Sequence, residues 1–499
     1  MTEMPSVKPP SEEVAPGATQ FDARAAKSKN TGTLYKAREP IHPKLVHGKF
    51  RNIKWAVMIL ALATSFGLPW IRLDRGPGLP DQAFLLDFAH QRLYFFWLEI
   101  WAQEFYYVTG ILVLSALALF LATAVAGRIW CGYACPQTVW TDLMVLAERL
   151  WQGDRNARIR LSKSPWSFDK AWRMAGTHLT WVLISLATGC AFIFYFADAP
   201  TLASELWHGT ASGLVYVFIA IFAIFTYLLG ALSREQVCTY MCPWPRIQGA
   251  MFDGDSLLIT YRGFRGEPRG PIRKGQGWEG RGDCIDCGQC VAACPAGIDI
   301  RHGAQLECIG CALCIDACDE IMDKIGRPRK LIAYDSFTNL KAESHGDRVP
   351  YRLIRPRTML YAAIFTLVAS VMLYGLLTKA VLEVNVVPDR NPLFVEVSGG
   401  GIRNGYTVRI LNKKHGEHKF AISVTGLKDA SLSYVGIEAG EPPVAVKSDD
   451  VRAVKVYVTV PGEEAAQMPS TANIAFIVHD TADGTETTRH TNFRGPGKQ

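Results

Sequence analysis

Residues 284–318 read CIDCGQCVAACPAGIDIRHGAQLECIGCALCIDAC, and they carry the strongest structural signal in the chain. Two runs in this stretch share the spacing C-x₂-C-x₂-C-x₃-C. In such runs three cysteines surround one iron–sulfur cube, and the fourth reaches the cube of the other run. Two zinc sites or unbound thiols would not need the duplicated three-residue gap. The sequence therefore predicts a bacterial-type 2[4Fe-4S] ferredoxin insert with two ligand sets: Cys284, Cys287, Cys290 and Cys318, and Cys308, Cys311, Cys314 and Cys294.

The composition around this insert is that of a membrane protein. Of 499 residues, 49% are apolar and 20% are charged, against roughly 25% charged residues in soluble proteins. The net charge of +7 comes from basic residues beside apolar runs, so no nucleic-acid partner is predicted. Twelve of the 13 cysteines fall in four compact groups, which indicates metal ligation and not a disulfide scaffold.

Five apolar runs approach the length that a hydrocarbon layer of about 30 Å requires. They predict a polytopic α-helical protein in a lipid bilayer, with spans at Trp55–Ile71, Tyr107–Ala126, Leu179–Ala197, Leu214–Leu232 and Met359–Thr378. Lys and Arg number ten in residues 1–54 and eight in 127–176, but three in 72–105 and none in 197–212. The positive-inside rule therefore predicts a cytosolic N-terminus and insert, with the C-terminal part in the periplasm of a bacterial inner membrane.

The last 110 or so residues show the alternation and β-branched runs of an all-β sandwich. The expected strands include Thr407–Leu411, Lys419–Val424, Val451–Val460 and Asn473–Val478. No cysteine occurs in this part of the sequence, so a disulfide cannot stabilise it. Its hydrophobic core must do so alone.

Two C-x₃-C-P motifs follow apolar spans, at Cys131 and Cys135 and at Cys238 and Cys242. Cysteines at positions i and i+4 share one helical face, and the proline after the second cysteine is expected to end the helix. If the two helices are neighbours, four sulfurs converge at the membrane edge. A thiolate site of this kind selects Cu(I), zinc or an iron–sulfur centre, and the sequence leaves the three open. Arg128 and Arg234 are expected to lower the pKa of the nearby thiols.

In combination, these features resemble the cytochrome c oxidase accessory protein family, known as CcoG, FixG or RdxA. The resemblance covers nearly the whole chain. It rests on W-C-G-Y-A-C-P at 130–136, V-C-T-Y-M-C-P-W-P-R at 237–246, the eight-cysteine insert and the terminal β domain. The resemblance implies an immunoglobulin-like fold for that domain. The composition, apolar runs and alternation along the chain predict these boundaries: cytosolic tail 1–50, four-helix membrane domain 51–260 with the two C-x₃-C-P motifs, ferredoxin-like insert with linkers 261–357, fifth transmembrane helix 358–380 and periplasmic β domain 381–499.

The function implied by this resemblance is reduction of Cu(II) to Cu(I) during assembly of a cbb3-type cytochrome c oxidase, as a cupric reductase. The eight insert cysteines then hold two [4Fe-4S] clusters. Cys131, Cys135, Cys238 and Cys242 form the catalytic copper site. Oxidase subunits or copper chaperones are the expected partners, with a cytosolic electron donor that the sequence does not identify. The alternative is an electron-transfer subunit that passes electrons to quinone or a partner reductase without copper.

Overall fold

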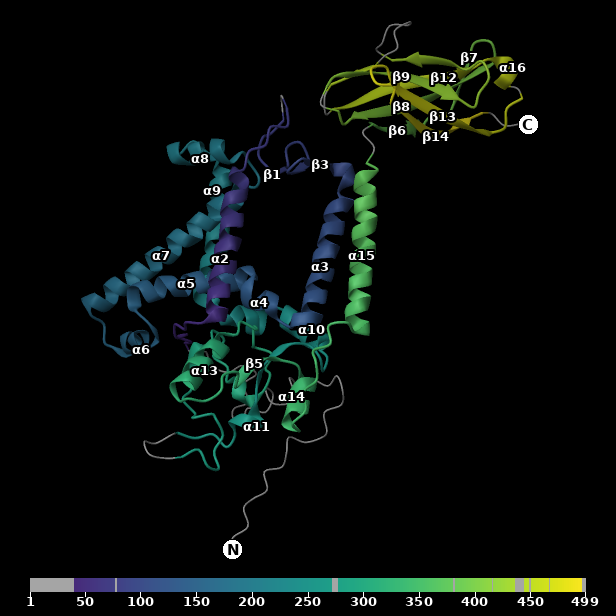
Figure 1. Ribbon diagram of the computed structural model, residues 1–499. Coiled ribbons are helices and arrows are strands. Elements are labelled where there is room, and N and C mark those ends of the chain that lie inside the picture. The colour runs from purple at the N-terminus through teal and green to yellow at the C-terminus, as the bar shows by residue number, and fades with distance from the viewer. Residues whose placement is uncertain are drawn as a thin grey trace, which may run out of the picture. The chain divides into compact units, whose positions relative to one another are not determined.

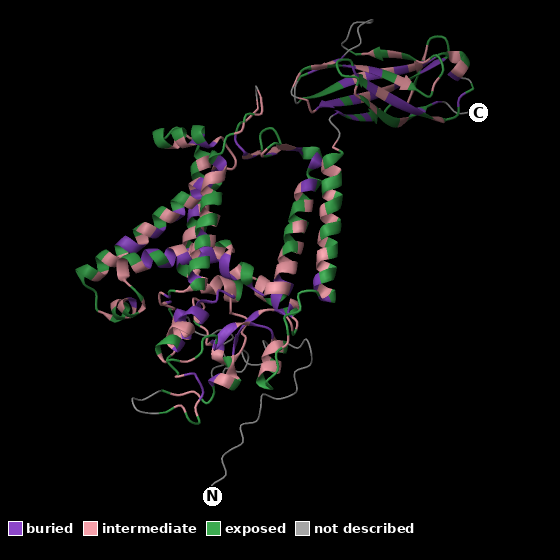
Figure 2. Cartoon of the chain, in the orientation of Figure 1, coloured by how far each residue is buried: buried purple, intermediate pink, exposed green. Residues whose placement is uncertain are grey.

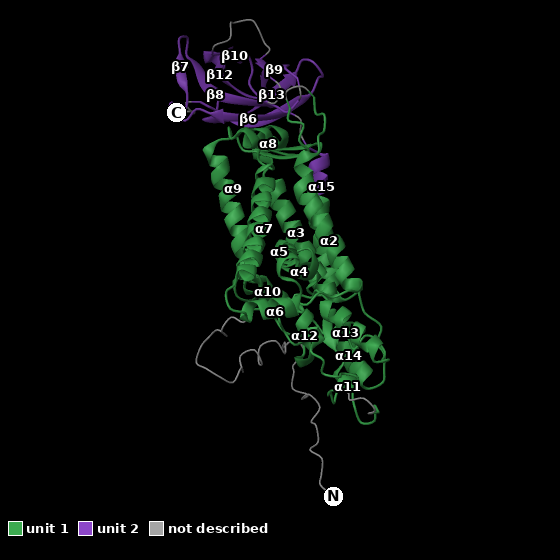
Figure 3. Ribbon diagram, turned by 90° about the vertical axis from the view of Figure 1, so that its left-hand side faces the viewer, with its two compact units in different colours: residues 1–372 green, residues 373–499 purple. Residues whose placement is uncertain are grey.

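The computed structural model describes residues 40–76, 79–271, 277–379, 382–414, 416–435, 444–447, 450–465 and 467–495. The chain divides into two compact units, Met1–Met372 and Leu373–Gln499 (Figures 1 and 3). Most of the predicted tail, residues 1–39, lies outside the described residues. The first unit holds most of the membrane helices and the insert, and the second holds the β domain.

Five helices among the described residues are long and apolar enough to cross a membrane, as predicted. Only 0–39% of the most apolar window of each helix is buried, so most of their apolar side chains face outward (Figure 2). An outward apolar surface of this kind suits lipid. The five are α2 (Lys49–Gly67) with the 3₁₀ turn η1 (Leu68–Trp70), η2 (Ala102–Glu104) with α3 (Tyr106–Ala126), α7 (Phe168–Ile193), α9 (Gly213–Thr226) with the π-helical η3 (Tyr227–Ser233), and α15 (Pro356–Leu377).

Helix α7 begins well before the apolar run that predicted it. Its N-cap is Ser167, whose hydroxyl accepts a hydrogen bond from the backbone N–H of Lys170, and Asp169 lies in the favourable first turn. Residues 168–178, which include the charged Asp169, Lys170 and Arg173, therefore extend the helix beyond the predicted apolar run. Hydropathy alone does not detect such an extension.

Small residues allow the membrane helices to approach closely. A Cβ atom on Gly189 of α7 would lie 2.6 Å from the carbonyl oxygen of Ile219 in α9. Helices α3 and α15 lie side by side in Figures 1 and 3, and the rings of Phe120 and Tyr361 are 6.3 Å apart between them. Packing through glycine is typical of helices in lipid.

Shorter elements connect the spans. Strands β1, β2 and β3 form an antiparallel sheet before α3, which the sequence did not predict. The other connecting helices lie mostly at the ends of the spans. The bounds are β1 (Phe84–Asp87), β2 (Arg92–Phe95), β3 (Leu98–Trp101), α4 (Ile129–Tyr133), α5 (Pro136–Gln152), α6 (Arg155–Lys163), α8 (Ala199–His208), the π-helical η4 (Val237–Met241) and α10 (Trp244–Met251).

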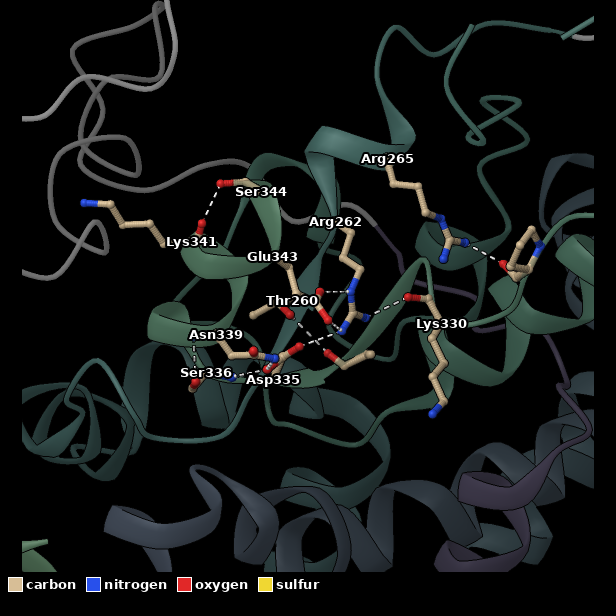
Figure 4. Close-up of polar contacts among 12 residues, drawn as sticks. Thr260, Arg262, Arg265, Lys330, Asp335, Ser336, Asn339, Lys341, Glu343 and Ser344 are labelled. Atoms are coloured by element: carbon tan, nitrogen blue, oxygen red, sulfur yellow. Dashed lines mark hydrogen bonds and ion pairs between the residues drawn. The ribbon is translucent and has the colours of Figure 1, made fainter. Parts of the chain in front are cut away.

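The described part of the insert is built on a two-stranded antiparallel sheet and a set of short helices, of which α13 and α14 are the longest. Arg262, at the end of the first strand, donates hydrogen bonds to the carboxylates of Asp335 and Glu343 and to the carbonyl of Lys330 (Figure 4). This guanidinium fixes α14 against the sheet. The elements are β4 (Leu258–Tyr261), α11 (Gly263–Gly266), α12 (Gln289–Ala293), η5 (Ile300–His302), α13 (Leu313–Lys324), β5 (Ile332–Asp335) and α14 (Phe337–Ser344).

The start of α2 is joined to the insert. Its N-cap residue, Gly48, has no side chain to accept from the first turn, and the Asp316 carboxylate of α13 accepts from the backbone N–H groups of Phe50 and Arg51 at 3.3 and 2.8 Å. A Cβ atom at Gly48 would lie 2.4 Å from that carboxylate. Upstream, the N–H of Lys44 donates to the carbonyl of Ala292 at 2.8 Å. From residue 40 onward the predicted tail is therefore packed against the insert.

The second unit is a sandwich of two antiparallel sheets, as the alternation predicts. One sheet has the order β10-β12-β8-β6, with β7 also paired to β8, and the other has the order β11-β9-β13-β14. The bounds are β6 (Leu382–Pro388), β7 (Val395–Val397), β8 (Gly401–Asn412), β9 (His418–Thr425), β10 (Ser431–Tyr434), β11 (Val444–Val446), β12 (Val451–Val460), α16 (Gly462–Ala465), β13 (Thr471–Asp480) and β14 (Glu486–Arg494).

A fully buried aromatic pair fills the centre of this sandwich. The rings of Tyr406 and Phe476, one from each sheet, lie 5.0 Å apart, and both side chains are 0% exposed. The Tyr406 hydroxyl donates to the carbonyl of Asn492 at 2.9 Å, so its polar end is satisfied across the sheets. Packing of this kind holds the domain without a disulfide.

Candidate iron–sulfur and thiol centre

The eight insert cysteines surround two cavities. Cys284, Cys287, Cys290 and Cys318 line one, and Cys294, Cys308, Cys311 and Cys314 line the other, with Cys290 at the boundary of both. The fourth cysteine of each run thus lies with the first three of the other run. This is the arrangement that two crossed ligand sets need.

Burial keeps several of these thiols protonated in the absence of metal. It raises the pKa of Cys294 to about 12 and that of Cys308 to about 11. Burial also raises the pKa of Cys290, Cys314 and Cys318, and neighbouring thiols add to the shift at Cys314 and Cys318. Thiolates in such surroundings form by exchanging protons for metal. Four sulfur donors around each of two small cavities fit a resident iron–sulfur cluster in each.

The C-x₃-C-P motifs differ from the expected helical pairs. Cys131 lies in α4, whereas Cys135 has an extended conformation and Pro136 is the first residue of α5. Cys238 lies in η4, whereas Cys242 is extended and Pro243 is the N-cap of α10. Proline restricts the residue before it to extended geometry and favours helix starts. The prediction that each pair shares one helical face is therefore wrong, because each motif joins two helices.

The two motifs nevertheless come together at one end of the membrane helices. The charges of Cys135, Cys238 and Cys242 contribute to the raised pKa of Cys131. Those of Cys135 and Cys242 contribute to the raised pKa of Cys238. Gln137, next to the first motif, donates to the carbonyls of Leu229 and Arg234 before the second motif. We call these four cysteines the thiol quartet.

The thiol quartet is not a ready-made site for a single ion. Within the part of the chain that the structure describes, no group of three or more His, Cys, Asp or Glu side chains could hold one metal ion. The predicted convergence of four sulfurs on one ion is therefore not seen among the described residues.

Burial reverses the predicted effect of the arginines on the quartet. It raises the pKa of Cys131 to about 12 and that of Cys238 to about 11, although Arg128 lowers both. The guanidinium of Arg234 forms an ion pair with the carboxylate of Glu148. Arg128 acts on both thiols in the predicted direction, but the net pKa of Cys131 and of Cys238 is raised. Desolvation outweighs the neighbouring positive charge.

Gln248 of α10 is a site residue that sequence reasoning missed. Its side chain is 0% exposed. It accepts a hydrogen bond from the Cys131 thiol at 3.3 Å through Oε1 and donates to the Thr123 hydroxyl at 3.2 Å through Nε2. This fully buried amide fixes the orientation of one quartet thiol. The only signal in the sequence is its position six residues after Cys242, which specifies no role.

A cavity of about 50 Å³ opens beside the quartet and is bounded by α2, α5, η4 and the insert. Cys238, Glu235 and Glu307 are among its lining residues. Arg51 and Lys54 also line it, and both pair with the buried carboxylate of Asp142. The cavity beside Cys238 is therefore lined by basic as well as acidic residues.

Comparison with known proteins agrees with this architecture. Residues 233–337 match the family model of a 4Fe-4S dicluster domain, and residues 108–152 match a 4Fe-4S binding domain. Residues 372–496 match the IG-like fold at the C-terminus of FixG. The predicted ferredoxin insert and immunoglobulin-like domain are thus confirmed.

Three relatives are similar over most of their length. The chain is 48% identical to protein RdxB of Cereibacter sphaeroides over 94% of this chain and 98% of that protein. It is 45% identical to nitrogen fixation protein FixG of Rhizobium meliloti, over 93% and 94% of the two chains. It is 46% identical to protein RdxA of Cereibacter sphaeroides, over 86% and 91%. The chain therefore belongs to the FixG, RdxA and RdxB family of membrane proteins with 4Fe-4S domains and a C-terminal immunoglobulin-like domain.

Proposed function

We propose that this protein reduces Cu(II) to Cu(I) at the thiol quartet for assembly of a cbb3-type cytochrome c oxidase. The observation that carries the proposal is the hydrogen bond of 2.9 Å that Arg128, three residues before Cys131 of the quartet, donates to the carbonyl of Cys308 in the insert. This contact supports a short path between the proposed cluster ligands and the proposed copper site.

In this proposal the eight insert cysteines hold two [4Fe-4S] clusters, which supply one electron at a time when bound. Cu(II) gains one electron and becomes Cu(I), and a low-potential one-electron donor protein replaces that electron. Glu235 and Glu307 offer oxygen ligands to the harder Cu(II), and the quartet offers sulfur to the softer Cu(I). Buried Gln248 orients the Cys131 thiol toward this exchange.

The excess of Lys and Arg in residues 1–54 and 127–176 supports a cytosolic position for the insert and the quartet. The same topology exports the immunoglobulin-like domain to the periplasm. There it would dock an oxidase subunit or a copper chaperone. The donor would then be a cytosolic protein.

Serine substitution of Cys131 and Cys238 tests the copper site. We expect the double variant to reduce Cu(II) at close to the uncatalysed rate, because a hydroxyl does not replace a soft thiolate. Iron content should stay at about eight per chain, since the insert ligands are intact. The measurement is anaerobic Cu(II) reduction by protein in liposomes, with iron analysis of the same samples.

Cys190→Ser is the matched control, because Cys190 lies within α7 and packs among apolar residues away from both motifs. This control should keep the wild-type rate. An unchanged rate in the double variant, with the clusters intact, would refute the quartet as the site of copper reduction.

A second candidate is an electron-transfer subunit that passes electrons to quinone or a partner reductase without copper. It is favoured by the 4Fe-4S binding model, because the matched residues 108–152 include Cys131 and Cys135. In that case the quartet holds a third iron–sulfur centre.

Metal analysis separates the two candidates. Copper reduction at the quartet predicts about eight irons per chain, and a third [4Fe-4S] centre predicts about twelve. Protein purified without oxygen should be analysed for iron and copper and assayed with a soluble quinone. Twelve irons, no bound copper and quinone reduction would support the second candidate and overturn the first.

A further inference from the structure

Arg128 lies between the insert and the thiol quartet. Arg128 is 5% exposed, and it is the N-cap residue of α4, directly after the C-cap residue of α3. The groups that act on its charge include the thiols of Cys308 in the insert and of Cys131 and Cys238 in the quartet. A single buried cation thus lies within electrostatic reach of one insert ligand set and both membrane motifs.

The hydrogen bonds of Arg128 tie three segments together. Its Nη1 donates to the carbonyls of Leu306 and Cys308, the latter at 2.9 Å, and its Nη2 donates to the carbonyl of Pro245 in α10. Helices α4 and α10 lie at the end of the spans that faces the insert in Figures 1 and 3. The guanidinium therefore joins the start of the first motif, the helix after the second motif and the ligand loop.

The backbone of the first motif also lies close to the backbone of the loop between Cys308 and Cys311. A Cβ atom on Gly132 would lie 2.8 Å from the carbonyl oxygen of Gly310, between Cys308 and Cys311. Gly310 has a φ of +72°, and a Cβ atom there would lie 3.1 Å from the carbonyl oxygen of Arg128. The Tyr133 hydroxyl donates to the carbonyl of Cys311 at 3.2 Å. The loop between Cys308 and Cys311 is thus pressed directly onto the first motif.

The other ligand set has its own arginine. Arg301 lines the cavity of Cys284, Cys287, Cys290 and Cys318, and its charge acts on Cys290. Its guanidinium is bound by the carboxylates of Asp299 and Asp286, both from the insert. Cys287 of this set is exposed. This set therefore has an open side, and the ion pairs of its arginine with Asp286 and Asp299 lie within the insert.

We propose that Arg128 is a positioning residue that holds the ligand loop of Cys308 and Cys311 against the quartet and favours the reduced form of the group held by that ligand set. The inference rests on the proposed function and deepens it. In this arrangement the ligand set nearer the thiol quartet is that of Cys294, Cys308, Cys311 and Cys314. The set with exposed Cys287 then faces the soluble donor.

The first test is a redox titration of both clusters, followed by EPR on the full-length protein. A positive charge beside a cluster stabilises its reduced, more negative form. Arg128→Met should lower the reduction equilibrium constant of the group held by the Cys294, Cys308, Cys311 and Cys314 set by about tenfold, or 59 mV for one electron. The other group should keep its potential.

Two further variants control for simple structural damage. Arg301→Met should lower the potential at the other ligand set and spare the first, which is the reverse pattern. Arg128→Lys keeps the charge and should restore most of the potential lost in Arg128→Met. An Arg128→Met protein whose two potentials are unchanged, or fall equally, would overturn the proposal.

The contact itself is tested by Gly132→Ala, which adds one methyl group against the carbonyl of Gly310. After anaerobic reduction and removal of excess reductant, mixing with Cu(II) should reoxidise this variant on the order of tenfold more slowly than wild type, because misplacement of reacting partners is costly. Both potentials should be unchanged. Gly263→Ala is the control, since a Cβ atom there meets nothing within 4 Å.

These measurements test copper reduction and the role of Arg128 separately. Failure of the wild-type protein to reduce Cu(II) would overturn the proposed function, and the potentials, measured without copper, would still test Arg128. Normal reoxidation in Gly132→Ala, with wild-type protein active, would overturn the contact as the electron route.

Discussion

Replacing Cys294 with serine is expected to remove the cluster of the other cysteine run while leaving the cluster of its own run in place. Cys294 belongs by sequence to the run that begins at Cys284, but it lines the cavity of Cys308, Cys311 and Cys314. Iron should fall from about eight to about four per chain. EPR of the reduced protein should keep the signal whose potential depends on Arg301 and lose the one that depends on Arg128.

Cys318→Ser provides the reciprocal control, because Cys318 lines the cavity of Cys284, Cys287 and Cys290. It should remove the Arg301-dependent signal and keep the other. Each variant is measured by iron analysis and EPR after anaerobic purification. Retention of the Arg128-dependent signal in Cys294→Ser would show that each run holds its own cluster, contrary to the crossed arrangement.

Replacing Glu148 with alanine is expected to destabilise the membrane unit by about 3–5 kcal/mol, because it leaves two arginines with an uncompensated charge. Glu148 is 4% exposed, and its two carboxylate oxygens bind Arg158 and Arg234. Arg158 is itself 2% exposed. The measurement is the free energy of unfolding in mixed detergent micelles.

The control for this prediction is Glu320→Ala, which breaks the exposed pair of Glu320 with Lys324 in α13. Surface pairs of this kind contribute about 0–1 kcal/mol. A similar loss of stability in the two variants would refute the structural role of Glu148. A selective loss in Glu148→Ala, with the iron content unchanged, would place the effect in the membrane unit.

Local sequence patterns predicted the helices and strands whose formation depends on residues close together in the sequence. Apolar runs located all five spans, because a membrane helix must be apolar over its length. Alternation located strands such as β12, since one face of a sandwich strand is buried. The ends were less predictable, as α7 shows, because polar residues with a good N-cap continue a helix beyond the apolar run.

The details of the candidate site depended on tertiary packing and were predicted less well. Pro136 was expected to end a helix, but it begins one, since proline fits the first turn as readily as it blocks continuation. The pKa of Cys131 was expected to fall beside Arg128, but burial raises it. The contact of Arg128 with the carbonyl of Cys308 joins residues 180 positions apart, and no local pattern specifies it.

The carboxylate of Asp316 has a consequence for how the protein matures. It caps the first turn of α2 from the helix that also carries Cys314 and Cys318. A ribosome makes α2 long before it makes this cap, so the helix enters the bilayer with its first N–H groups unsatisfied by protein. Folding of α13 against α2 completes the helix start later. Hydrogen exchange at the amides of Phe50 and Arg51 should therefore report whether the insert has docked onto α2.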